Sequence, residues 1–86
     1  MKSDTYKEDI PSYALCYLIN GDSSGLEQSD IDIIDRFMNS YYEIAEQKNG
    51  HVVVDIPDDE ESFFAPYPAF GLPCDAYSCN IVILWN

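Results

Sequence analysis

The sequence has few basic residues. Lysine and arginine together number four in 86 residues, against sixteen aspartates and glutamates, so the net charge is −12. Proteins that contact DNA or RNA directly use clusters of lysine and arginine, and the same side chains bind anionic membranes. The composition therefore argues against direct contact with nucleic acid or membranes. It permits a basic protein partner, a divalent cation or mimicry of a nucleic-acid backbone.

Long apolar runs are also missing. No segment approaches the roughly 18 apolar residues of a membrane span, and the opening residues MKSDTYKEDIPS lack the apolar core of a secretion signal. The three cysteines are an odd number, which fits a reducing compartment. We therefore expect a cytoplasmic protein.

Signatures of catalysis are equally scarce. There is one histidine, His51, and no nucleophile elbow, phosphate-binding loop or dinucleotide glycine pattern. A cysteine with His51 could act as nucleophile and base, but no pattern places them together. Cys16, Cys74 and Cys79 with His51 have loose spacing for a zinc site. We expect buried thiols, with a Cys74–Cys79 disulfide as the alternative, and we predict no enzyme activity, metal or other cofactor.

The stretch from residue 13 to residue 50 is the most regular part of the chain. Residues 13–19, YALCYLI, form a continuous apolar run, which favours a strand covered on both faces. Asn20-Gly21 is a tight-turn signal. A helix is predicted next, from a capping box at Ser29-x-x-Asp32 to a stop at Asn49-Gly50.

The predicted helix has two distinct sides. Apolar residues cover about half of its circumference at about 100° per residue. They are Ile31, Ile33, Ile34, Phe37, Met38, Tyr41, Tyr42, Ile44 and Ala45. Four acids, Asp32, Asp35, Glu43 and Glu46, share the polar side.

The remaining segments complete an α+β fold. Further strands are predicted at 51–56 and 80–85, and the prolines and aromatics of 62–78 predict a packed loop across the sheet face opposite the helix. Residues 1–11 are predicted to be a flexible arm. The expected fold is a single domain over 12–86, with a three-stranded mixed or antiparallel sheet and one long amphipathic helix (β-α-β-β).

The turn before the helix resembles the first half of a calcium loop. Asn20, Asp22 and Ser24 place oxygen atoms at alternate positions before Gly25. The twelfth position would be Ile31, where the motif requires an acid. A turn followed by a helix cap accounts for the same residues, and a calcium-binding module at Asn20–Asp32 is kept as an alternative.

Acidic residues are the feature that folding explains least. The candidate binding residues are Asp32, Asp35, Glu43, Glu46, Asp58, Asp59, Glu60 and Glu61. A solvated charged face is the simplest interpretation, and the functional one is a docking surface for a basic protein. A second functional hypothesis is a nucleic-acid mimic that inhibits a host DNA- or RNA-binding enzyme, which needs both acidic clusters on one continuous face.

Two longer segments carry a family resemblance. PSYALCYLINGDSSGLEQSDIDIIDRF and PAFGLPCDAYSCNIVIL, with the motifs INGDxSGL at Ile19–Leu26 and PAFGLxCD at Pro68–Asp75, resemble a domain of unknown function in small uncharacterised proteins from phages and mobile elements of gut bacteria. The resemblance implies a phage or mobile-element context, in which short acidic proteins often bind host proteins, and it identifies no target and assigns no residue a role. A monomer and a homodimer both remain open, because a wide apolar arc and an unpaired sheet edge would support a dimer.

Overall fold

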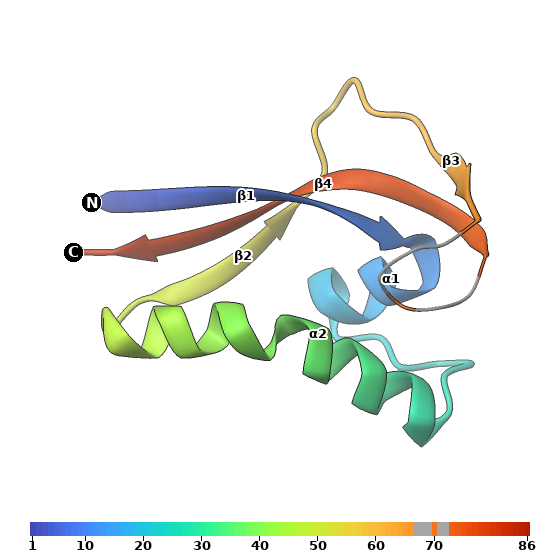
Figure 1. Ribbon diagram of the computed structural model, residues 1–86, viewed down its shortest axis with the longest axis horizontal. Coiled ribbons are helices and arrows are strands. Elements are labelled where there is room, and N and C mark those ends of the chain that lie inside the picture. The colour runs from blue at the N-terminus through green and yellow to red at the C-terminus, as the bar shows by residue number, and fades with distance from the viewer. Residues whose placement is uncertain (67–69, 71–72) are drawn as a thin grey trace.

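The computed structural model describes residues 1–66, 70 and 73–86, and in these residues it shows a four-stranded sheet with two helices on one side (Figure 1). The elements are β1 (Lys2–Pro11), α1 (Ser12–Asn20), α2 (Gln28–Gln47), β2 (His51–Asp55), β3 (Phe63–Ala65) and β4 (Cys74–Trp85). The α+β class is confirmed. The predictions of three strands and a single helix are wrong, because residues 2–11 form an extra strand, residues 63–65 another, and residues 12–20 an extra helix.

Strand β4 is the centre of the sheet. β1 pairs along one side of it, and β2 and β3 pair in turn along the other, all antiparallel. The register places Tyr6, Ile81 and Val54 in one row. Residues that face each other across strands point to the same side of a sheet, so this row shares the face that the helices cover.

The expected flexible arm is a strand. All ten residues of β1 pair with β4, from Lys2 opposite Trp85 to Pro11 opposite Ala76. Ile10 and Pro11 are fully buried at the end of β1. Pairing with a strand more than sixty residues away orders this polar segment, and its composition alone does not indicate that pairing.

The apolar run that was predicted to be a strand is helix α1. Ala14 and Leu15 face the core, while Gly21 caps the helix in a left-handed conformation with φ 70°. The Gly21 N–H donates to the Tyr17 carbonyl at 2.9 Å, which is the usual closure of a helix end. A short apolar run is ambiguous between a buried strand and a buried helix, and here the glycine serves as a helix cap.

Helix α2 lies where the sequence predicts it. It begins at Gln28 and ends at Gln47, with Lys48 as its C-cap and Asn49 at φ 54°. The predicted capping box at Ser29 and Asp32 is wrong by two residues, because the Asp30 carboxylate accepts the Glu27 N–H at 3.1 Å. No helix among the described residues combines the length and apolarity needed to cross a membrane.

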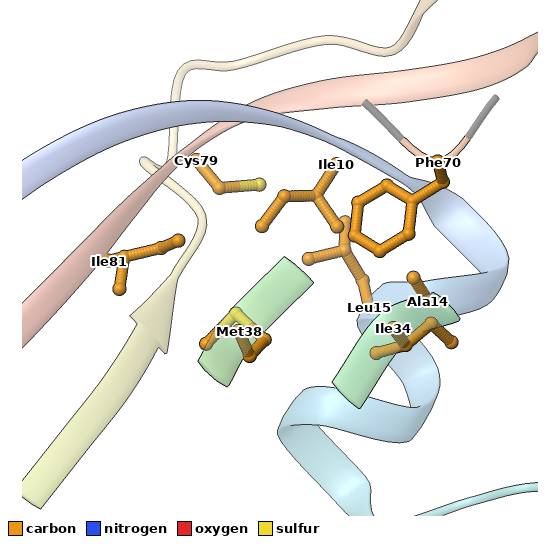
Figure 2. Packing of buried hydrophobic residues seen from close by; sticks show 8 residues of the cluster. All are labelled: Ile10, Ala14, Leu15, Ile34, Met38, Phe70, Cys79 and Ile81. Carbon is orange, nitrogen blue, oxygen red and sulfur yellow. The ribbon is translucent and has the colours of Figure 1, made fainter. Parts of the chain in front are cut away.

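The core fills the space between the sheet and the two helices. Figure 2 shows side chains from β1, both helices and β4 converging there: Ile10, Ala14, Leu15, Ile34, Met38, Phe70, Cys79 and Ile81. Phe70 also contacts Phe37 of α2, with ring centroids 4.5 Å apart.

The aromatic loop was predicted to cross the opposite face of the sheet. For Phe70 that prediction is wrong, since its ring packs on the helix side, where it joins the core. Phe63 and Phe64 lie in β3 with 39% and 65% of their surfaces exposed, so they do not form a buried cover either. Tyr67, Pro68, Gly71 and Leu72, which belong to the same predicted loop, lie outside the described residues.

A polar contact joins α2 to β1. The Tyr41 hydroxyl donates to a Glu8 carboxylate oxygen at 2.5 Å, and the Tyr41 and Tyr6 rings lie 5.3 Å apart. Burial, followed by the bond to Glu8, raises the pKa of Tyr41 to about 12. Both tyrosines lie at the margin of the core, since Tyr41 packs against it and Tyr6 is 36% exposed.

Candidate protein-binding surface

Four acids form a stripe on the exposed side of α2. Asp32, Asp35, Glu43 and Glu46 are all exposed. At about 100° per residue they fall within an arc of about 80°, whose centre lies about 120° around the helix from the buried residues Ile34, Met38 and Ala45. We call these four residues the acidic stripe. It is rigidly presented, because the buried side of α2 is packed against β2 and β4.

The polar contacts of the acidic stripe are with neutral side chains. Asp32 accepts a hydrogen bond from the Gln28 amide at 2.9 Å, and Glu43 accepts one from the Asn39 amide at 3.1 Å. These bonds orient the carboxylates without neutralising them. The exposed Arg36 stands one turn after Asp32 at the border of the stripe, so the four carboxylates leave an excess of negative charge on this side of α2.

Asp35 stands beside two tyrosines. The Tyr17 hydroxyl, from α1, donates to Asp35 at 3.4 Å, and the negative charge of Asp35 is the main cause that raises the pKa of Tyr17. Burial first, and then the charge of Asp35, raises the pKa of Tyr42. Tyr42 is nevertheless 45% exposed, so an apolar ring lies beside the charged stripe. We call these three residues the tyrosine–aspartate cluster.

Neither tyrosine of this cluster was predicted to be a surface residue. Tyr42 was counted on the apolar side of the helix, and Tyr17 lay in a segment predicted to be a buried strand. Tyr42 could have been found from the helical wheel, because it stands at the border of the apolar arc. Tyr17 could not have been found from the sequence, because its approach to Asp35 depends on how α1 packs beside α2.

The second acidic cluster, at residues 58–61, lies elsewhere. Asp58, Asp59 and Glu61 are exposed, while Glu60 is half-buried and its N–H donates to the Pro57 carbonyl at 3.0 Å. Figure 1 shows this segment, between β2 and β3, rising on the side of the strands away from α2. The structure therefore does not join the two clusters into the continuous face that the nucleic-acid-mimic hypothesis requires.

The turn at residues 20–25 is closed by its own side chains. The Asp22 carboxylate accepts the Ser24 N–H at 2.9 Å, and this bond lowers the pKa of Asp22. Ile31, at the position where a calcium loop needs an acid, is part of α2. Across the described ranges, no group of three or more His, Cys, Asp or Glu side chains is arranged to hold a metal ion, and no pocket is present.

The three cysteines are separate and free. Cys79 is buried as predicted, and burial is the main cause that raises its pKa to about 11. Cys16 is exposed, contrary to the prediction, because its segment is a helix with an outer side. The Cys74–Cys79 disulfide is also wrong, since five positions along one strand separate the two by about 16 Å. His51 is exposed at the start of β2, in register with Leu84 rather than with a cysteine.

Comparison with known proteins gives one match. No curated protein and no solved structure matches the chain significantly. A family model described as a domain of unknown function, DUF6926, matches residues 7–84 and so spans most of the chain, from within β1 to near the end of β4. The chain therefore belongs to the DUF6926 family.

Proposed function

We propose that this chain is a small protein-binding module, and that a basic surface of another protein docks on the acidic stripe of α2. The observation that carries the proposal is the set of four exposed carboxylates within one arc of the helix, next to the tyrosine–aspartate cluster. The phage and mobile-element resemblance of the sequence favours a host protein as the partner.

The dimensions of the stripe suit such a contact. From Asp32 to Glu46 the helix rises about 21 Å, which is long enough to face several basic side chains at once. Opposite charges accelerate encounter and fix orientation, whereas aromatic residues supply the buried contact that slows dissociation. Tyr42, on the flank of the stripe beside Asp35, adds an exposed aromatic ring to these charges.

A matched pair of variants tests the proposal. The stripe variant replaces Asp35, Glu43 and Glu46 with lysine. The control replaces Asp58, Asp59 and Glu61 with lysine, which makes the same change of net charge at the other exposed cluster. Each variant, tagged, is used to capture proteins from a bacterial lysate at about 0.15 M salt, and circular dichroism checks that both fold.

The stripe variant is expected to lose the captured partner, and the control is expected to retain it. Capture should also weaken steeply with added salt, because screening shortens the reach of the charges. Undiminished capture by the stripe variant would show that the helix face is not the site. An equal loss in both variants would show that net charge, and not this surface, retains the captured protein.

A further inference from the structure

The outer edge of β1 is the longest free edge of the sheet. β1 has ten residues, about twice the usual strand length, and it pairs only with β4 within the described part of the chain. An edge of this kind presents unpaired N–H and C=O groups on every second residue. We propose that this edge pairs with the same edge of a second copy of the chain, so that two four-stranded sheets join into one.

The helices leave this edge accessible. α2 packs mainly on β2 and β4, the two strands away from the outer edge of β1, whereas α1 packs on β1 itself as well as on β2 and β4. Tyr41 reaches Glu8 from above the sheet face rather than across the edge. Backbone hydrogen bonds from the described turns and loops do not involve β1. A second strand can therefore approach β1 in the plane of the sheet.

Symmetry restricts the register. Two identical antiparallel edge strands are related by a two-fold axis perpendicular to the sheet, and residues that face each other must point to the same side. One residue of β1 must therefore face its own copy across the axis. Residue pairs on either side of that residue are fixed by counting outward from it in both directions.

The charges of β1 select the register centred on Thr5. In that register Lys2 faces Glu8 of the second copy, and the symmetry repeats this pair, so the dimer contains it twice. The Tyr41 hydroxyl bonds to one oxygen of Glu8 and leaves the other for this lysine. Ser3 faces Lys7 of the second copy, and this pair of a neutral and a positive side chain creates no like-charge repulsion.

Each neighbouring register brings like charges together. Centring on Asp4 sets two copies of that carboxylate opposite each other. Centring on Tyr6 sets Asp4 against Glu8 twice, and centring on Lys7 sets two copies of that lysine opposite each other. Like charges directly opposite are destabilising in a sheet. Thr5 is therefore the centre at which the strand complements itself.

Net charge gives the dimer a distinctive salt dependence. Each chain carries −12, so two copies repel each other at long range. Salt at about 0.15 M screens charges beyond about 8 Å and leaves the strand contacts themselves in place. Dimerisation should therefore strengthen as salt rises from about 0.01 M to about 0.15 M, which is opposite to the salt dependence expected for binding of a basic partner.

Cysteine cross-linking tests the register. Thr5→Cys is made in a Cys16→Ser background, which removes the exposed native thiol. At the two-fold axis the new thiols have Cβ atoms about 5 Å apart, close enough to form a disulfide with a small adjustment. Ser3→Cys on the same sheet face is the matched control, because the register separates its two copies by four positions. Mild oxidation should give a covalent dimer with the first variant and a monomer with the second.

A charge reversal gives an independent measurement. Lys2→Glu sets glutamate against Glu8 twice per dimer, and Lys7→Glu changes net charge equally while facing only Ser3. Analytical ultracentrifugation should show a dimer dissociation constant roughly tenfold higher for the first variant and little change for the second. A monomer at every concentration up to about 0.5 mM, equal cross-linking of both cysteine variants, or equal effects of the two reversals would each overturn the proposal.

Discussion

Replacing Gly50 with alanine is expected to destabilise the fold more than the same replacement at Gly21 or Gly25. Gly50 joins α2 to β2, and a Cβ atom at this position would overlap the Leu84 carbonyl oxygen of β4. It would also lie 3.0 Å from both the Leu84 carbonyl carbon and the Trp85 Cβ. The φ angle of Gly50 is not in the left-handed region, so close approach of the two backbones is what requires glycine here.

Neither the Leu84 backbone nor the Gly50 backbone can move easily to relieve this overlap. Leu84 is paired with Ser3 of β1 and with His51 of β2, so its carbonyl is fixed in the middle of the sheet. The Gly50 N–H donates to the Ala45 carbonyl at 2.8 Å, which fixes the other backbone. Overpacking of a fixed site usually costs about 1–3 kcal/mol, and backbone overlap belongs at the upper end, so we expect about 3 kcal/mol.

Urea unfolding followed by circular dichroism measures this loss of stability, and variants at Gly21 and Asn49 are its controls. In Gly21→Ala the added Cβ meets no other atom within 4 Å, so the only cost is that alanine must adopt the left-handed conformation at φ 70°. We expect the free energy of unfolding to fall by about 1 kcal/mol. Asn49→Gly removes the strain of a non-glycine residue at φ 54°, so the free energy of unfolding should rise by a few tenths to about 1 kcal/mol. A Gly50→Ala cost no greater than that of Gly21→Ala would refute the close-approach reasoning.

Three further outcomes follow from packing and charge. Met38→Ala, at a fully buried position, should lower the free energy of unfolding by about 2–5 kcal/mol, measured by urea titration. Because the pKa of Tyr41 is raised from near 10 to about 12, its stabilising contribution should be complete below pH 10 and lost as pH rises to 12. Tyr41→Phe should abolish this loss, and at pH 7 it should cost about 1 kcal/mol through the missing bond to Glu8. Tyr42→Ser should weaken partner binding by about 1 kcal/mol, mainly through faster dissociation seen by surface plasmon resonance, and it should destabilise the fold less than Met38→Ala because the Tyr42 side chain is 45% exposed.

Local periodicity explains which parts of the fold could be predicted. The apolar spacing from Ile31 to Ala45 is long enough to specify a helix and its buried side, and α2 follows it. The β-branched run Val52-Val53-Val54 indicates β2 by composition rather than by period, and the structure half-buries Val52 and Val54 on one face. Residues 13–19 are too short and too uniformly apolar for period to separate strand from helix, which is why α1 was misassigned.

Strand β1 could not be predicted because its pairing is non-local. Most of its side chains are polar and exposed on both faces, so the segment carries no hydrophobic alternation except near Ile10. Its conformation is imposed by β4, whose apolar residues lie at the other end of the chain. The acidic stripe, by contrast, follows from helical spacing alone, whereas the contact of Tyr17 with Asp35 depends on how two helices meet.

The geometry of the sheet links the two proposed surfaces. A two-fold axis perpendicular to the joined sheet keeps both α2 helices on the same side, so a β1-paired dimer would present two acidic stripes in one direction. A partner displayed densely on a sensor surface could then engage both stripes, and its apparent affinity would exceed that of one stripe by about a hundredfold or more. Lys2→Glu should remove this gain while leaving the affinity for partner free in solution unchanged. If Lys2→Glu lowered the affinity equally for partner on the sensor surface and for partner in solution, Lys2 would belong to the docking surface itself.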